Sequence, residues 1–368
     1  MAQATETAAL PLIRVGMPLP SGRLLAHGIT SGLPLMFSAN AFARYRQGEF
    51  IGFRLQDAAA IPAHVDAALD SAGFTAAAHY GDYRFSVDDY LELVATRDWA
   101  FWSAMDYCVE PQVAPDAAMR RLRVEATIAR YWECVDKAAK RGLKPPLPVL
   151  QGLMFDEYAR CAQEMAIGPD VPLVGIGSVC RRHLYGPDGV LAIVAALDEI
   201  LPRETRLHLF GLKGAGSLGV LVRQFPHRIA STDSMAWDMA VRRSCPTGRD
   251  QELRAIAMIE WHQRETRQLR AWKGKAVVVP STQPRHRSPA EIAAEAVGKA
   301  LGSLLRTRDI SYLDGRRFLQ QDAVIVEHLL ATEGLDAFAE EEPEDDRGLG
   351  IVYAEVRQAL VESGLLPV

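Results

Sequence analysis

Five polar side chains that could do chemistry each follow a short apolar run: Asn40 after LMFSA, Asp70 after AAL, Asp106 after WSAM, Gln151 after PVL and Asp233 after IAST. Another run ends in Gly-Ile-Gly-Ser at 175–178. A charge at the end of a buried strand is costly unless it sits in a polar site. One such aspartate is often a helix N-cap, but five positions together indicate one shared pocket. Carboxylates in a pocket can act as nucleophiles or as general acids and bases.

The apolar runs alternate with segments of helical spacing, which is typical of βαβ units and a parallel sheet. Expected strands span 33–40, 64–73, 99–108, 145–152, 171–180, 206–214 and 227–234, and expected helices span 118–141, 155–166, 189–201 and 216–224. Seven such units in about 200 residues predict an α/β fold, a closed (β/α)8 TIM barrel. The run at 275–281 is a candidate eighth strand. The active site of such a barrel lies at the carboxyl ends of the strands, where the polar residues fall.

The chain divides into three expected parts. Residues 1–30 form an N-terminal segment that we expect to be partly flexible. The barrel spans 31–290, and residues 291–368 form a helical C-terminal extension.

The composition argues against membrane and secreted classes. Hydrophobic residues make up 49% and charged residues 24% of the chain, which is ordinary for a globular enzyme. No apolar run approaches the roughly 20 residues of a membrane helix, and the N-terminus lacks the basic start and apolar core of a signal peptide. The five cysteines are scattered without a C-x-x-C pair, which indicates reduced thiols. We expect a cytoplasmic protein with no membrane partner.

Charge is distributed unevenly along the chain. The formal net charge is −5, yet residues 242–287 hold eleven Lys and Arg against four Asp and Glu. A local basic zone can bind phosphates although the whole protein is acidic. A solvated helix face with internal ion pairs is the alternative interpretation.

Several segments resemble motifs of the tRNA-guanine transglycosylases, and they occur in that family's order. LDSAGF at 69–74 looks like the family's D-S-G-G-F segment, and MDYCVEP at 105–111 resembles its strand with a base-reading aspartate. VLQG at 149–152 is similar to its V-Q-G motif, and VGIGSV at 174–179 to its glycine-rich strand. TDSMAWDMA at 232–240 looks like the archaeal form of its nucleophile segment. The matches cover roughly residues 30–245 and imply a TIM barrel that exchanges nucleobases.

The resemblance implies two catalytic carboxylates. Asp233 would attack the sugar C1′ and hold the sugar as a covalent intermediate, as in retaining glycosidases. Asp70 would manage the protons of the departing and entering bases. Asp238 lies close to Asp233 in the sequence, but a position inside a helix would aim it less well. A helix N-cap is the structural alternative for Asp233.

A second group of matched residues would bind the base. Asp106 would accept from the N1–H and the exocyclic amine of a guanine-like edge, while Gln151 and the backbone around Gly177 would donate to O6. Small residues after Asp70 would let the base and the sugar approach the backbone. Phe74 follows them and would stack on the base, with core packing as the alternative interpretation of its ring. The full expected base-binding set is Asp106, Gln151, Gly175, Ile176, Gly177, Phe74 and Ser71.

An extruded base must come from a nucleic acid whose phosphates are also held. The candidates for these phosphate contacts are Arg181, Arg182, Lys213, Arg242 and Arg243. An ordinary surface position is the alternative for each of them.

The family's zinc site, C-x-C-x-x-C with a later His, has no full counterpart here. The corresponding region offers only Cys245 and His262, which do not make a closed zinc site, so we expect no metal and no cofactor. Nothing after Arg306 resembles an appended RNA-binding domain. This divergence favours the DpdA-like branch, which places a 7-deazaguanine base (preQ0-like) into DNA.

Three other functions remain open from the sequence. They are a tRNA-guanine transglycosylase that has lost its zinc, a purely hydrolytic nucleic-acid glycosylase, and a non-catalytic nucleic-acid-binding relative. The expected partners are DNA, with tRNA as the alternative, and a small 7-deazaguanine base. A homodimer or helper proteins are further possibilities.

Overall fold

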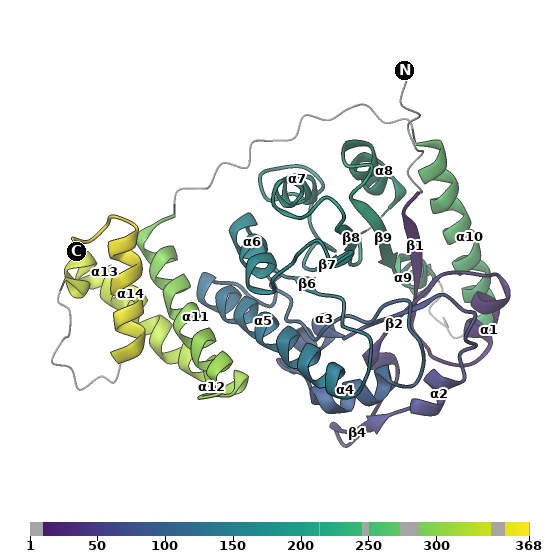
Figure 1. Cartoon of the computed structure of the whole chain (residues 1–368), viewed down its shortest axis with the longest axis horizontal. Coiled ribbons are helices and arrows are strands. Elements are labelled where there is room, and N and C mark those ends of the chain that lie inside the picture. Colours follow the sequence, from purple (N-terminus) through teal and green to yellow (C-terminus); the bar gives the residue numbers. More distant parts are fainter. Residues whose placement is uncertain (1–9, 213, 245–249, 273–286, 340–349, 368) are drawn as a thin grey trace.

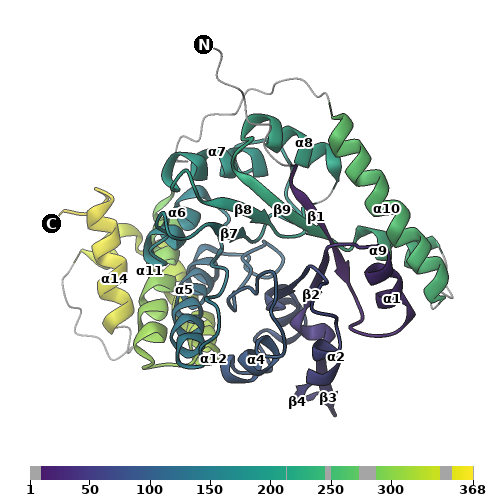
Figure 2. The ribbon, with the colours of Figure 1, turned by 45° about the vertical axis from the view of Figure 1, so that its right-hand side comes forward.

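A single parallel sheet forms the centre of the protein. The computed structural model describes residues 10–212, 214–244, 250–272, 287–339 and 350–367. Seven strands pair in the order β5-β2-β1-β9-β8-β7-β6, and the sheet curls so that its two edges approach each other (Figures 1 and 2). The strands are β1 (Leu12–Met17), β2 (Leu35–Ser38), β5 (Ala67–Asp70), β6 (Val149–Leu150), β7 (Leu173–Ile176), β8 (Arg206–Leu209) and β9 (Ile229–Ser234).

The expected closed barrel of eight strands is not found among the described residues. The expected strand at 99–108 is irregular, and it makes only single parallel bridges, from Trp102 to Leu69 of β5 and from Ser103 to Leu147 just before β6. The candidate eighth strand at 275–281 lies outside the described residues. The fold is therefore an α/β half-barrel whose two edges are linked through an irregular segment.

One strand comes from residues that we expected to precede the barrel. β1 is the third strand of the sheet, with Val15 paired to Leu35 of β2 and Arg14 paired to Asp233 of β9. The sheet therefore includes residues before position 31. The expected strand at 33–40 is present as β2, and a small antiparallel hairpin follows it, made of β3 (Ala43–Arg46) and β4 (Glu49–Phe53).

Helices cover the outside of the sheet (Figure 2). The four helices for which bounds were predicted are present within two residues of their predicted ends, and Asp238 lies inside a helix, α9 (Ala236–Ser244), as expected. Those that surround the sheet are α1 (Arg23–Thr30), α2 (Leu55–Ala59), α4 (Val87–Val94), α5 (Ala117–Lys140), α6 (Phe155–Glu164), α7 (Val190–Ile200), α8 (Ala215–Gln224), α9 (Ala236–Ser244) and α10 (Gln251–Ala271). Among the described residues, no helix combines the length and the apolar character that a membrane crossing requires.

The C-terminal extension is helical and packs beside α5 at one side of the molecule (Figure 1). It contains α11 (Pro289–Thr307), α12 (Tyr312–Phe318), α13 (Val324–Thr332) and α14 (Gly350–Glu362). Ser288 and Glu291 form a capping box that fixes the start of α11. Gly298 and Gly302 let α11 approach α5 closely. A Cβ on Gly298, for example, would meet the Ala118 carbonyl oxygen at 2.3 Å. The extension has its own apolar core, to which Tyr107 and Leu122 contribute.

Candidate active site

Three aspartates converge at the carboxyl edge of the sheet. Asp70 is the last residue of β5, and Asp233 lies near the end of β9. Asp106 follows the irregular segment that bridges β5 and the stretch just before β6. Burial, together with the charges of Asp106 and Asp233, raises the pKa of Asp70 to about 7, against the opposing effect of hydrogen bonds from Ala72 N–H and Ser38. The three carboxylates are thus close enough to influence one another, and at neutral pH Asp70 can both give and take a proton.

A closed set of hydrogen bonds holds Asp106 in place. The Ser71 hydroxyl donates to Asp106 Oδ1 at 2.8 Å, and the Tyr83 hydroxyl donates to the Asp106 main-chain oxygen at 2.8 Å. The next residue, Tyr107, donates its hydroxyl to Asp82 at 2.8 Å, and Asp82 also accepts from the Tyr83 N–H at 2.7 Å. We call these four residues, Asp82, Tyr83, Asp106 and Tyr107, the Asp106 bracket.

Gln151 connects Asp106 to the neighbouring strand end. The Val109 N–H donates to the Ser178 hydroxyl at 2.8 Å, and that hydroxyl donates to Gln151 Oε1 at 2.6 Å. The amide of Gln151 must then turn its Nε2 to Asp106 Oδ2, at 2.5 Å. Burial raises the pKa of Asp106, while the donors Ser71 and Gln151 act in the opposite direction. We expected Gln151 to donate to the base, but one of its N–H groups already donates to the Asp106 carboxylate.

The glycine-rich strand end differs from the expectation that its backbone donates to the base. The Gly177 N–H donates to the Leu150 carbonyl at 2.9 Å, and its carbonyl accepts from the Tyr158 hydroxyl at 2.7 Å. A Cβ on Gly177 would lie 2.2 Å from Gln151 Nε2, and a Cβ on Gly175 would meet the Phe210 ring at 2.4 Å. Ile176 is fully buried. These glycines therefore make room for protein side chains, and the Gly177 N–H is used within the sheet.

The small residues after Asp70 are also explained by protein contacts. Ser71 is fully buried, and its N–H donates to the Ser103 hydroxyl at 2.9 Å. Ala72 has a φ of 72°, a left-handed conformation that is strained for a residue with a Cβ. A Cβ on Gly73 would lie 2.5 Å from the Asp106 main-chain oxygen. Gly73 is therefore required so that Asp106 can pack directly against this turn.

Asp233 is held through one of its two carboxylate oxygens. Its Oδ1 accepts from the Gly211 N–H at 2.8 Å, and His208 Nε2 lies 3.4 Å from the same oxygen. The neighbouring Asp238 is different, since it is buried in ion pairs with Arg254 at 2.6 Å and Arg242 at 2.8 Å. Asp238 is thus a structural carboxylate, whereas Asp233 lies at the strand end beside the other two aspartates.

Two of the expected phosphate-binding arginines lie beside this cluster, with different roles. Arg182 donates to four main-chain carbonyls, of Gly152, Leu153, Ser178 and Asp188. Its guanidinium therefore fixes loops and is a poor candidate for a phosphate. The half-exposed Arg181 places its guanidinium 4.9 Å from the centre of the Phe74 ring. Phe74 is 38% exposed, and the Arg181 guanidinium lies over one face of its ring.

The basic zone is only partly described. Arg242 pairs with Asp238, and Arg243 is exposed. Lys213 and Cys245 lie outside the described residues, as do residues 273–286. Within the described part of the chain, no three His, Cys, Asp or Glu side chains form a cluster that could hold a metal ion. His262 interacts with the Ile13 backbone. The absence of zinc stays a prediction, because Cys245 is not described.

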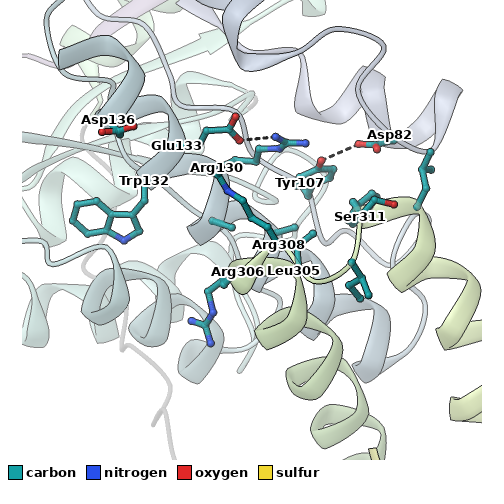
Figure 3. A pocket seen from close by; sticks show the side chains of 15 residues that line it. Asp82, Tyr107, Arg130, Trp132, Glu133, Asp136, Leu305, Arg306, Arg308 and Ser311 are labelled. Atoms are coloured by element: carbon teal, nitrogen blue, oxygen red, sulfur yellow. Dashed lines mark hydrogen bonds and ion pairs between the residues drawn. The ribbon is translucent and has the colours of Figure 1, made fainter. Parts of the chain in front are cut away.

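A separate cavity of about 660 Å³ lies where α5 meets the C-terminal extension (Figure 3). Three arginines and three acidic residues line it, so its charges balance. Arg130 pairs with Glu133 at 2.6 Å, and the Tyr107 ring stacks on Tyr312 with centroids 4.3 Å apart. The cavity marks the joint through which the extension contacts the Asp106 bracket.

Sequence reasoning missed three residues of this site. Tyr83 lies in the segment YRFS at 83–86, and Ser178 ends the run GIGS at 175–178, but the hydrogen bonds of neither residue can be read from the sequence. His208 is a lone histidine inside the apolar strand RLHLF. The sequence signal for His208 was a polar residue within an apolar run; its fully buried position opposite Ser231, which shares a face with Asp233, is seen in the structure.

The fold and the site together define an α/β protein with a parallel sheet and a carboxylate pocket at the carboxyl edge of its strands. A family model described as DpdA, DeoxyPurine in DNA protein A, matches residues 26–296, which is most of the chain. The chain belongs to the DpdA family. This membership implies involvement in deazapurine modification of DNA. A comparison with curated proteins finds no match to this sequence.

Proposed function

We propose that this protein is a base-exchange transglycosylase that replaces guanine in DNA with a 7-deazaguanine base. The convergence of Asp70, Asp106 and Asp233 at one sheet edge carries the proposal. A base exchange needs a nucleophile, a proton carrier and a reader of the base, and three carboxylates in different environments can fill these roles.

In the first half of the proposed reaction, Asp233 attacks C1′ of the target nucleotide. A bond forms between a carboxylate oxygen and C1′ while the bond from C1′ to the guanine N9 breaks. Protonated Asp70 gives its proton to the departing base. The sugar-phosphate chain stays intact because the sugar remains bound to Asp233.

In the second half, a 7-deazaguanine base occupies the place of guanine. Asp70, now ionised, takes the proton from N9 of the entering base, whose N9 forms the new bond to C1′ and releases Asp233. Asp106 reads N1–H and the exocyclic amine in both halves. Ser71 and Gln151 support this role, because they donate to Asp106 and favour its ionised form.

DNA is the proposed substrate because the family acts in DNA modification. The target base must leave the helix to reach a pocket at the strand ends. Arg243, which is exposed, and Arg181 are the proposed phosphate contacts. Arg181 is half-exposed and lies 3.7 Å from a Glu110 carboxylate oxygen, a longer contact than those that Arg182 and Arg242 make to their protein partners. A tRNA transglycosylase and a hydrolytic glycosylase are the competing functions.

The test supplies radiolabelled guanine and a 7-cyano-7-deazaguanine base separately, each with duplex DNA and with tRNA. Label in DNA supports the proposal. Label in tRNA alone would assign the protein to the tRNA reaction, and abasic sites without label would make it a hydrolase. The Asp233→Asn protein is the matched control for label that enters without catalysis.

A further inference from the structure

A buried histidine lies directly beneath Asp233. His208 on β8 is fully buried, and its register partner across the sheet is Ser231 on β9. Ser231 and Asp233 are two residues apart on one strand, so their side chains lie on the same face. The imidazole ring of His208 spans both of them. Its Nδ1 lies 2.7 Å from the Ser231 hydroxyl, and its Nε2 lies 3.4 Å from Asp233 Oδ1.

The surroundings of His208 favour a neutral ring. Burial lowers the pKa of His208, and the Arg14 guanidinium lowers it further, although Asp233 acts in the opposite direction. The rings of Phe101 and Phe210 lie 5.0 and 4.6 Å from the imidazole and exclude water. The groups facing His208 are thus one cation, one carboxylate, one hydroxyl and two apolar rings.

A neutral imidazole carries one N–H, and the other nitrogen must accept a hydrogen bond. Nε2 is buried without a well-aligned partner in the described structure, and Asp233 Oδ1 is the acceptor nearest to it. Buried N–H groups are almost always paired, and catalytic hydrogen bonds are often long before substrate binds. The Ser231 hydroxyl can donate to Nδ1, which leaves the proton on Nε2.

We propose that His208 is a positioning residue for the nucleophile: Ser231 fixes its Nε2–H tautomer, and this N–H together with the Gly211 N–H holds Asp233 Oδ1, so that Oδ2 is the oxygen that attacks C1′. A neutral donor suits this task because it orients the carboxylate without neutralising its charge. The attacking-oxygen assignment rests on the proposed function, whereas the tautomer and its contact with Asp233 do not.

The first arm of the test needs no activity. In the ¹⁵N NMR spectrum of the full chain with labelled histidine, the resonances of His208 are assigned by their loss in His208→Gln. We expect the Nε2–H tautomer. Asp233→Asn should shift Nε2 and leave Nδ1 nearly unchanged, while Ser231→Ala should shift Nδ1. An Nδ1–H tautomer, or an Nε2 resonance that ignores Asp233→Asn, overturns the proposal even if the wild type exchanges no base.

The second arm compares base exchange in two variants. His208→Leu removes the donor from a buried site, so kcat for guanine exchange into DNA should fall about 10- to 100-fold with KM and DNA affinity nearly unchanged. His208→Gln keeps an N–H at the place of Nε2 and should recover most of the rate. A wild-type kcat in His208→Leu, or an equal loss in both variants, overturns the positioning role. An inactive wild type would refute the base-exchange function, with the NMR arm still deciding the contact.

Discussion

Asp70 occupies an environment that makes ionisation of its carboxyl group unfavourable. The carboxyl is buried and faces two other aspartates, and its pKa of about 7 compares with 3.8 for an ordinary aspartate. Such a shift connects catalysis and folding, because one group whose pKa differs between the folded and unfolded states makes stability depend on pH. The same burial that tunes Asp70 for proton transfer therefore destabilises the folded protein at neutral pH.

Asp70→Asn should stabilise the protein more at pH 8 than at pH 4. Between about pH 4 and 7 the folded state keeps a proton on Asp70 that the unfolded chain has lost, so stability falls as pH rises through this window. The variant cannot ionise and escapes this loss, which is on the order of 1–4 kcal/mol. Urea unfolding at both pH values measures it, with the exposed Asp98→Asn as the control. An equal effect of Asp70→Asn on stability at both pH values would contradict this explanation. In the same variant, the rate of base exchange should fall about 10²- to 10⁴-fold, because the proposed proton carrier is lost.

Asp233→Asn and Asp238→Asn should have opposite effects. Asp233→Asn keeps the shape of the nucleophile but removes its charge, so exchange and any protein–DNA adduct on denaturing gels should vanish while the melting temperature stays close to the wild-type value. Asp238→Asn weakens the charge pairing of the buried Arg254 and should cost about 3–5 kcal/mol of stability at most. Folded Asp238→Asn protein should still form the adduct. An adduct in Asp233→Asn would assign the nucleophile elsewhere.

The sequence could locate the carboxylates because each one follows its own apolar run, which is a local signal. It could not show what each residue touches. The role of Gln151 depends on the hydrogen bond from Ser178, and that of Gly177 depends on the register of β6 against β7. His208 was missed because the sequence does not reveal that β8 and β9 bring it next to Asp233.

At the scale of elements, the ends of β6 and β7 work as a unit. Gln151 follows β6, Gly177 follows β7, and Tyr158 of α6 donates to the Gly177 carbonyl. The absence of a side chain on Gly177 lets the Gln151 amide lie flat against the backbone and reach Asp106. The geometry of the Asp106 carboxylate, for which we propose base reading, is thus set by two strand ends and one helix.

Gly177→Ala should impair use of the base without unfolding the protein. The new Cβ would lie 2.2 Å from Gln151 Nε2, which must move away from Asp106. Loss of a buried hydrogen bond costs about 1–3 kcal/mol, so kcat/KM for the free base should fall roughly 10- to 100-fold. Gly216→Ala on α8 is the matched control, because nothing lies within 4 Å of its Cβ position. Wild-type kinetics in Gly177→Ala would mean that Gln151 does not support Asp106.

Strand prediction succeeded where the apolar run was continuous and failed in two places. The LIRVGM segment of β1 is interrupted by Arg14, whose charge is compensated by Asp66 at 2.7 Å, a partner 52 residues away. The segment at 99–108 has the composition of a strand, yet it forms only single bridges. Both errors arise because tertiary contacts, which a local pattern does not contain, decide whether an apolar run becomes a strand.

At the scale of the whole molecule, the C-terminal extension supports the active site from outside the sheet. Tyr312 of α12 stacks on Tyr107, and Arg316 donates to the Gly81 carbonyl at 2.9 Å. The first contact is to Tyr107, a member of the Asp106 bracket, and the second is to the residue that precedes Asp82. The apolar core of the extension also includes Tyr107 and Leu122, so the expected boundary at residue 291 does not separate the extension from the site.

Tyr312→Leu should weaken base recognition from a distance. The substitution keeps an apolar side chain but removes the stacked pair, which is worth about 0.5–1.5 kcal/mol. We expect a small loss of stability and a rise of about 2- to 10-fold in KM for the free base. Leu313→Ala is the control, since Leu313 is 49% exposed on the same helix. Unchanged KM in a folded Tyr312→Leu protein would limit the extension to a packing role.

The position of β1 also governs the order in which the chain can be assembled during synthesis. Its partner β9 ends at Ser234, so the strand made first must wait for more than two hundred residues before its second edge is covered. Pairings between such distant segments form slowly, because the intervening loop must first be closed. Until then β1 has no neighbour on that side. A nascent chain released before β9 emerges would hold Asp70 and Asp106 but would present the edge of β1 to other chains.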